Sequence, residues 1–291
     1  MVAVSVFTPI YNRSKYLRTL YNCLCAQTSK DFEWIVVDDG SADDCDLAME
    51  QILKNHDNSF EITYKKKVNG GKHTAINYGV KLSHGELFFI LDSDDSLPSD
   101  SIEIVIEQFK TIANDKNICG VSGLMSHHNG ALIGSGYPTD GFVACSLELR
   151  YKYGVMGDLI EVFRTNILRE FPFPEIGGER FCPEALVWNR IATKYKLKCF
   201  NRVVYYRDYL DGGLTSNIIR IRMNSPIASM MCYSELCSYD IPFFPKAKAA
   251  INYWRFRFCK KDKSQTIRLG LKWTWVIPIA YLMHLNDCRI H

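Results

Sequence analysis

The first half of the chain alternates short apolar segments with amphipathic ones, and the apolar segments recur roughly every 30 residues, about the length of one βαβ unit. They are nearly continuous and rich in β-branched and aromatic residues, as are strands covered on both faces. They lie at residues 2–7, 32–37, 60–64, 87–91 and 119–124. The pattern predicts a mostly parallel sheet flanked by helices. We expect Pro9 to end the first strand, because proline cannot donate to a ladder.

Polar side chains follow the ends of these predicted strands. They are Thr8, Asp38, Asp39, Asp92, Ser93, Asp94 and Asp95. Right-handed crossovers between parallel strands place the carboxyl ends of the strands along one edge of a sheet. Ligands of such sheets bind at that edge. We therefore expect these side chains, which are far apart in the sequence, to gather at one rim.

The acidic cluster at residues 92–95 predicts a metal site. Carboxylates this close together repel one another unless a cation neutralises them. Hard oxygen donors suit Mg²⁺ or Mn²⁺, and either ion can bridge to the phosphates of a substrate. The alternative is a solvated loop in which an aspartate caps the next helix.

Two further segments indicate a nucleotide. Residues 69–79 open a predicted helix with two glycines and Lys72, and the N–H groups of a helix start together with an ammonium favour an anion such as a diphosphate. An ordinary glycine turn is the alternative. Asp38 and Asp39 can accept hydrogen bonds from a nucleobase or a ribose, although Asp39 can instead cap the following helix.

These motifs, taken in order, resemble the family 2 glycosyltransferases. The matching blocks lie at residues 4–12, 34–41, 71–79 and 91–95. The resemblance implies an α/β GT-A nucleotide-diphospho-sugar transferase fold, a nucleotide-sugar donor (usually a UDP-sugar), Mn²⁺ or Mg²⁺, and inversion. The implied nucleotide-binding residues are Thr8, Pro9, Tyr11, Asp38, Asp39, Lys72, Asn77, Asp92 and Ser93, and the implied metal ligands are Asp94 and Asp95.

An inverting transfer also needs a carboxylate that deprotonates the acceptor hydroxyl. In the family this base is usually the Asp of a Glu-Asp pair, followed by a helix that bears an Arg. Residues 183–190 resemble that segment, with Glu184 at the position of the Asp, but Pro183 stands where the family has the first acid. Glu179 is a nearby competitor. The alternative for Glu184 is a first-turn residue that the helix dipole favours.

The resemblance also places Asp158, Arg207 and Thr215 in the region that binds the acceptor or the donor diphosphate. Processive members of the family carry a Gln-x-x-Arg-Trp motif and several membrane spans, and the sequence shows neither. We therefore expect transfer of a single sugar to a saccharide or lipid-linked saccharide acceptor, in cell-surface polysaccharide or glycoconjugate synthesis.

The chain is expected to divide into a catalytic domain and a C-terminal region. The GT-A domain is predicted at residues 1–217, with a nucleotide-binding part at 1–97 and an acceptor part at 98–217. Residues 218–291 are predicted to form a helical, basic and aromatic appendage. Within it, residues 243–291 carry ten Lys and Arg and two Asp, a net charge of +8. The formal net charge of the whole chain is +3, so the charges of the remaining residues sum to −5.

The basic region has two interpretations that the sequence leaves open. Its interleaved aromatic and cationic side chains can lie on an anionic membrane surface, or the aromatics can pack on the catalytic domain. Nucleic acid is not expected as a partner, because no nucleic-acid-binding module is recognisable. The start of the sequence lacks a signal-peptide pattern and the 11 Cys form no C-x-x-C pair, so we expect a cytoplasmic protein, peripheral at the inner face of the membrane if the basic region binds there.

Three other classes compete with this interpretation. A sugar nucleotidyltransferase needs a Gly-rich phosphate loop directly after the first strand, and a dinucleotide-dependent dehydrogenase needs G-x-G-x-x-G there. No glycine precedes Gly40. A non-catalytic binding protein that keeps the GT-A fold remains open, and measurable hydrolysis of a sugar donor separates it from an enzyme.

Overall fold

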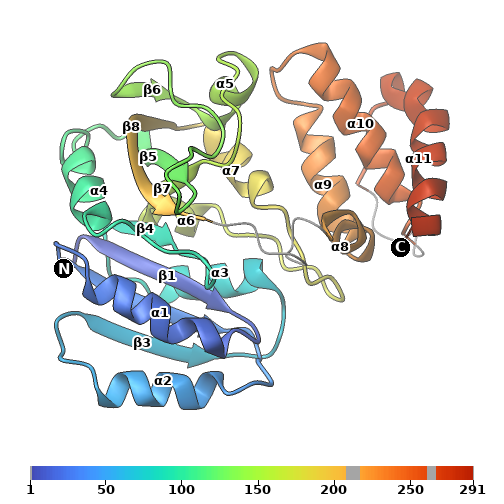
Figure 1. Cartoon of the computed structure of the whole chain (residues 1–291). Coiled ribbons are helices and arrows are strands. Elements are labelled where there is room, and N and C mark those ends of the chain that lie inside the picture. Colours follow the sequence, from blue (N-terminus) through green and yellow to red (C-terminus); the bar gives the residue numbers. More distant parts are fainter. Residues whose placement is uncertain (1, 208–216, 261–266, 291) are drawn as a thin grey trace. The chain divides into compact units, whose positions relative to one another are not determined.

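The computed structural model describes residues 2–207, 217–260 and 267–290 (Figure 1). Contacts divide the chain into two compact units. The first unit comprises Met1–Pro172 and Ile191–Asp208, and the second comprises Phe173–Arg190 and Tyr209–His291. The segment 173–190 thus packs with the C-terminal region rather than with the sheet.

Within the described residues, the first unit is built on an eight-stranded sheet in the order β3-β2-β1-β4-β7-β5-β8-β6. The strands are β1 Val4–Ile10, β2 Phe32–Asp38, β3 Glu61–Lys66, β4 Leu87–Ile90, β5 Ile118–Ser126, β6 Phe142–Ala144, β7 Ile160–Arg164 and β8 Lys196–Tyr206. The first four strands in this order are parallel to one another, and β8 is parallel to β5. The short strands β6 and β7 run antiparallel to their neighbours.

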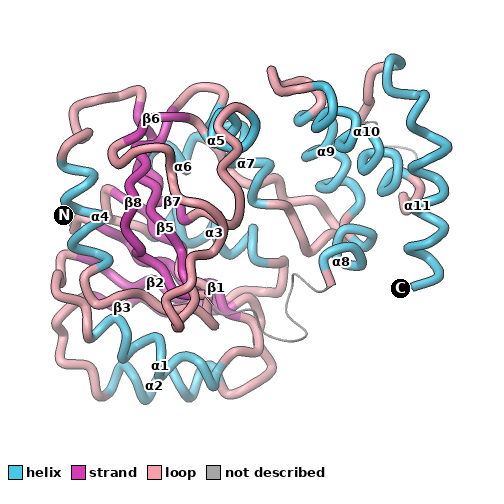
Figure 2. Tube along the Cα trace, turned by 45° about the horizontal axis from the view of Figure 1, so that its top comes forward, coloured by secondary structure: helices cyan, strands magenta, loops and turns pink. Residues whose placement is uncertain are grey.

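Helices cover both faces of this sheet. They are α1 Ser14–Cys25, α2 Cys45–Lys54, α3 Lys72–Leu82, α4 Ser101–Lys110, α5 Ser146–Tyr151 and α6 Thr165–Glu170. Figure 2 shows α1 and α2 side by side. Because successive side chains of a strand point to opposite faces, Val4 and Val6 of β1 join the core that includes Leu17 of α1, whereas Phe7 faces α3. An added Cβ at Gly79 of α3 would lie 2.2 Å from the Phe7 ring, so this close packing requires glycine. The predicted sheet flanked by helices is confirmed.

The first strand does not end where Pro9 predicts. Strand β1 continues to Ile10 and stays paired with β2, with Pro9 opposite Val37. On the other side, the pairing with β4 stops at Phe7. The missing N–H of Pro9 therefore falls beyond the end of the second ladder, where the sheet tolerates it.

The second half of the sheet also differs from the expectation. Beyond the strands predicted up to residue 124, the long strand β8 pairs with β5 and shows register shifts along it. Strands β6 and β7 were not anticipated. Strand β7 lies between β4 and β5, and its antiparallel direction separates the two parallel parts of the sheet.

The second unit is helical, as predicted for the C-terminal region. Its elements are α7 Glu184–Ala192 (whose last two residues belong to the first unit), α8 Ile218–Asn224, α9 Pro226–Leu236, α10 Phe243–Arg257, the 3₁₀ helix η1 Leu271–Val276 and α11 Ile277–Ile290. Arg255 of α10 forms a two-pronged ion pair with the buried Asp287 of α11, which joins these two helices. Of the helices in the described ranges, none combines the length and apolarity that crossing a bilayer requires.

Candidate active site

The carboxyl ends of β1, β2, β3 and β4 bring polar side chains to one edge of the parallel sheet. Lys72, the first residue of α3, forms an ion pair with Asp92 beyond β4, with 2.6 Å between Nζ and Oδ1. Arg13, beyond β1, approaches Asp94 at 3.8 Å. Segments that the sequence separates by up to about 80 residues therefore meet at the edge where parallel sheets bind their ligands.

Asp39 shapes the loop that leads into α3. Its carboxylate accepts hydrogen bonds from the backbone N–H groups of Gly70 and Gly71, at 2.9 and 2.6 Å, and from Lys67 Nζ at 2.7 Å. Gly71 precedes the helix with φ of 94°, a left-handed conformation that glycine adopts at little cost. Asp39 thereby fixes the position at which α3 begins and hence the position of Lys72.

The Asp38 carboxylate is held by groups of the chain itself. It is fully buried and accepts hydrogen bonds from the backbone N–H of Ser41 at 2.7 Å and from the Tyr64 hydroxyl at 3.1 Å. The bond to Ser41 closes the turn that follows β2. This arrangement stabilises the loop around Asp39.

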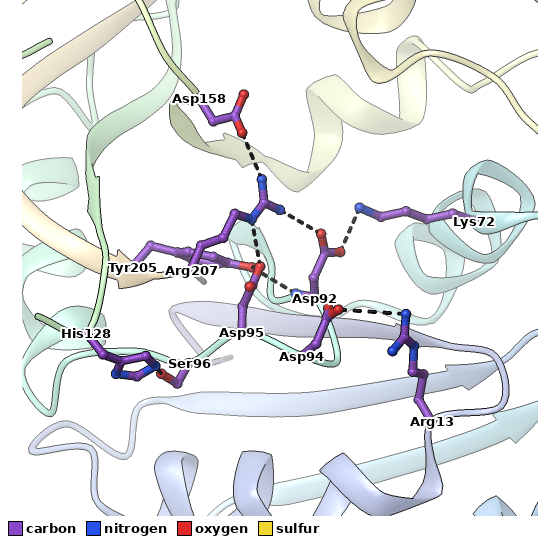
Figure 3. A network of polar contacts seen from close by, with 10 residues as sticks. All are labelled: Arg13, Lys72, Asp92, Asp94, Asp95, Ser96, His128, Asp158, Tyr205 and Arg207. Carbon is purple, nitrogen blue, oxygen red and sulfur yellow. Dashed lines mark hydrogen bonds and ion pairs between the residues drawn. The ribbon is translucent and has the colours of Figure 1, made fainter. Parts of the chain in front are cut away.

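The acidic cluster is organised around one guanidinium group (Figure 3). Arg207 donates from Nη2 to Asp92 at 3.0 Å, from Nε to Asp95 at 3.1 Å and from Nη1 to Asp158 at 3.1 Å. Arg207 directly follows β8, whereas Asp158 precedes β7. One side chain thus joins the loop beyond β4 to two later parts of the first unit.

Charge in this network is nearly balanced without any added ion. Among the described residues, the four carboxylates of Asp92, Asp94, Asp95 and Asp158 face the three cations of Arg13, Lys72 and Arg207, a formal sum of −1. Carboxylates that repel one another need a neutralising cation. In this structure the chain itself supplies most of that positive charge.

The pKa values of the two inner carboxylates diverge. Burial by itself would raise the pKa of Asp92, but Lys72 and Arg207 outweigh burial and hold it below its ordinary value. Burial raises the pKa of Asp95 to about 6; Arg207 opposes the rise and the charge of Asp92 adds to it. Asp92 therefore stays ionised throughout the neutral pH range. Ionisation of Asp95 costs more free energy than ionisation of Asp92.

Tyr205, which the sequence did not single out, anchors the cluster from β8. Its buried hydroxyl donates to Asp95 Oδ2 at 2.7 Å and accepts from the backbone N–H of Asp92 at 3.0 Å. Burial raises the pKa of Tyr205 well above its ordinary value, so the hydroxyl keeps its proton and remains a donor. Arg13 and Lys67 were missed as well. Their positions directly after β1 and β3 are the signal that could have found them.

The other nucleotide-binding candidates lie at the same end of the sheet or next to it. Thr8 is fully buried, and its hydroxyl accepts from the indole N–H of Trp34 at 3.0 Å. Tyr11 is about half exposed, whereas Asn77 and Ser93 are buried and Pro9 is partly buried. Their contacts with a nucleotide stay predictions.

The candidates for the base lie in the second unit. Glu184 is the first residue of α7 and is partly exposed. Glu179 is buried and accepts from the backbone N–H groups of Ile227 and Ala228, at 2.6 and 2.8 Å, in the first turn of α9. Arg190 of α7 pairs with Glu235 of α9 at 2.6 Å. Thr215 lies outside the described residues.

Fold and site together define a class. A mostly parallel sheet with helices on both faces, an acidic motif beyond the fourth strand and a lysine opening the adjacent helix are the arrangement of GT-A nucleotide-sugar-dependent glycosyltransferases. Residues 5–124 match the model of glycosyl transferase family 2, and this part of the chain belongs to that family.

Known relatives agree with this assignment. An uncharacterized glycosyltransferase of Rickettsia felis is 34% identical over 235 residues, which are 78% of this chain and 34% of the relative. This chain spans between 16% and 36% of the length of the Rickettsia relatives that it matches.

Two groups of solved structures share the fold. TarS of S. aureus in complex with UDP-GlcNAc is similar with a TM-score of 0.61 and 21% identity, over 96% of this chain and 79% of that chain. The mannosyltransferase PcManGT of Pyrobaculum calidifontis, in complex with GDP-Man and Mn²⁺, is similar with a TM-score of 0.56 and 17% identity, over 99% of this chain and 75% of that one.

Removing the Tyr205 hydroxyl tests how the cluster is held. We expect Tyr205→Phe to lower the free energy of unfolding by about 1–2 kcal/mol, because a buried carboxylate and a buried N–H both lose a partner. Urea unfolding measures the change. Tyr206→Phe is the control, since it removes the hydroxyl of the neighbouring residue of β8, which does not bond to Asp92 or Asp95. Equal effects of the two substitutions would show that Tyr205 does not anchor the cluster.

Proposed function

We propose that the chain transfers a single sugar from a nucleotide-diphosphate sugar, preferably a UDP-sugar, to a saccharide or lipid-linked saccharide acceptor with inversion at the anomeric carbon. The observation that carries the proposal is the ion pair between Lys72, at the start of α3, and Asp92 of the acidic motif. The N–H groups of a helix start and an ammonium together favour a diphosphate. The family assignment and the donors bound in TarS and PcManGT support the same class of ligand.

In this proposal the rim of the first unit binds the donor. Asp39 faces the nucleoside, and Lys72 holds the diphosphate that the helix start attracts. Arg207 is the second cation near the diphosphate, and Asp158 sets the direction of its guanidinium. Thr8, Tyr11 and Asn77 complete the nucleoside side of the site. Preorganised cations at a developing negative charge are an effective form of catalysis, because they need no reorganisation during the reaction.

A divalent cation, Mn²⁺ or Mg²⁺, is proposed as the cofactor. Clustered carboxylate oxygens suit these ions, yet the described residues contain no ready-made group of three or more His, Cys, Asp or Glu that could hold one. Asp94 fits best, because its carboxylate is partly exposed and its contact with Arg13 is long. Asp95 and Asp92 are bound by Arg207, so Arg207 must release at least one of them for the acidic motif to hold the ion. When bound, the ion supplies positive charge that stabilises the departing diphosphate.

Glu184 is proposed as the base that takes the proton of the acceptor hydroxyl. A carboxylate in this role must be able to approach the acceptor and gain a proton during attack. Glu179, the competitor, is committed to the first turn of α9, where it satisfies two backbone N–H groups that would otherwise lack partners. Glu184 is the better candidate because it is the partly exposed first residue of α7, whereas Glu179 is buried.

The proposed setting is cell-surface polysaccharide or glycoconjugate synthesis at the inner face of the membrane. The domain boundaries belong to the same proposal, with catalysis assigned to residues 1–217 and a supporting role to residues 218–291. A sugar nucleotidyltransferase and a non-catalytic GT-A-like binding protein are the alternatives, and hydrolysis of a sugar donor separates the enzyme from the binding protein.

Calorimetric titration of UDP, GDP, CDP and dTDP, each with and without Mn²⁺, tests the donor site. We expect one nucleotide to bind selectively, and at least about tenfold more tightly with the metal, a difference of 1.4 kcal/mol. Lys72→Gln should weaken this binding, while Lys81→Gln, at the exposed far end of α3, should not. Failure of all four nucleotides to bind would contradict the proposal.

Substitution of the proposed base separates binding from chemistry. We expect Glu184→Gln to keep the affinity for the donor and to lower the rate of sugar transfer by about 10²-fold or more, the usual contribution of general base catalysis. Glu170→Gln, at an exposed position of α6, is the matched control. Near-full transfer by Glu184→Gln would rule out this residue as the base.

A further inference from the structure

The last helix of the second unit exposes an apolar face. Helix α11 buries only a narrow stripe that includes Ala280 and Asp287. Its exposed large apolar side chains include Ile279, Leu282, Met283 and Ile290, and Leu282 is 68% exposed. Their spacing places them on one side of the helix. Exposed large apolar side chains that share one side of a helix favour contact with something apolar.

An open aromatic hollow lies beside the start of this helix. It has a volume of about 440 Å³ and is lined by Ile241, Phe243, Lys246, Lys272, Trp273 and Trp275. The Phe243 ring stacks with the rings of Trp273 and Trp275, with centroids 5.7 and 6.4 Å apart. Phe244 at the start of α10 is 78% exposed. The hollow therefore combines two ammonium groups with exposed apolar aromatic side chains.

The charge around these features is positive. Residues 243–291 hold ten Lys and Arg but only Asp262 and Asp287. Asp287 is buried and is neutralised by Arg255, and Asp262 lies outside the described residues. Asp240, exposed next to Ile241, is the carboxylate nearest in sequence to the hollow. Lys246 and Lys272 of the hollow thus lie among exposed apolar groups.

We propose that the apolar face of α11 and the aromatic hollow dock the second unit onto an anionic lipid bilayer. The apolar side chains of α11, with Phe244 and Trp275, enter the boundary between headgroups and acyl chains. Lys246 and Lys272 contact headgroup phosphates at the hollow, where each cation near an anionic surface adds to binding. In this proposal helix α11 lies along the surface of the bilayer.

The charge favours a bilayer over a second copy of the chain. Two copies joined through this face would bring two cation-rich surfaces together, which costs energy. An anionic bilayer offers the opposite charge and an apolar layer in the same place. The docking surface does not depend on the proposed sugar transfer, so each can fail without the other.

Sedimentation of the full chain with lipid vesicles tests the proposal. We expect it to bind vesicles of phosphatidylcholine with 30% phosphatidylglycerol, and to bind vesicles of phosphatidylcholine alone at least tenfold more weakly. Raising the salt concentration should weaken the binding, because salt screens exposed charges. Phe244→Ser with Leu282→Ser, and separately Lys246→Gln with Lys272→Gln, should each weaken binding about tenfold or more.

The matched control changes the same residue types in the first unit. Leu47→Ser with Lys54→Gln, both exposed on α2, should leave vesicle binding unchanged. Thermal unfolding and nucleotide titration of every variant show that the fold and the donor site persist. The proposal is overturned if the chain ignores anionic vesicles, or if the control weakens binding as much as the docking variants do. A dimer in sedimentation velocity would also overturn the proposal, if the double substitution Phe244→Ser with Leu282→Ser converts it to a monomer, because the face would then bind a second copy of the chain.

Discussion

The ion pairs of Arg207 with Asp92, Asp95 and Asp158 are the interaction on which the candidate site depends. Two of these carboxylates sit on one short loop beyond β4, and an unpaired buried charge is strongly destabilising. Arg207 pairs with both and ties them to Asp158, and the Tyr205 hydroxyl completes the partners of Asp95. The end of β8 is therefore held against the end of β4, and the acidic motif is ordered before any ligand arrives.

This internal neutralisation changes how the acidic motif is understood. Clustered aspartates suggest a metal-binding site, but two of the three carboxylates, those of Asp92 and Asp95, already form ion pairs with Arg207 or Lys72. A donor diphosphate offers the same two cations a new anionic partner. If the donor and the divalent ion bind as proposed, Arg207 and Lys72 would turn toward the diphosphate, and Asp92 and Asp95 would then be available to hold the ion. The exchange needs little net change of charge.

The sequence predicted the parallel part of the sheet because each strand there is a nearly continuous apolar run, and polar residues follow each strand end. It predicted less where local pattern is weak. Strand β7, of only five residues, lies between β4 and β5 although it follows both in the sequence. Pro9 is part of β1 because the pairing between β1 and β4 ends at Phe7, before the proline. Arg207 was named from the resemblance alone, since its partners are up to 115 residues distant. The commitment of Glu179 to α9 likewise depends on contacts that no local pattern reveals.

Manganese binding to the nucleotide-free chain tests the central claim most directly. Calorimetry or electron paramagnetic resonance would compare the unmodified chain with Arg207→Gln and with Arg202→Gln, which alters an exposed ion pair to Asp100. If Arg207 occupies the acidic motif as an internal cation, Arg207→Gln binds Mn²⁺ about tenfold or more tightly, because charged hydrogen bonds worth about 1.5–3 kcal/mol no longer compete. Arg202→Gln leaves the affinity unchanged. An equal or weaker affinity of Arg207→Gln for Mn²⁺ would contradict the account.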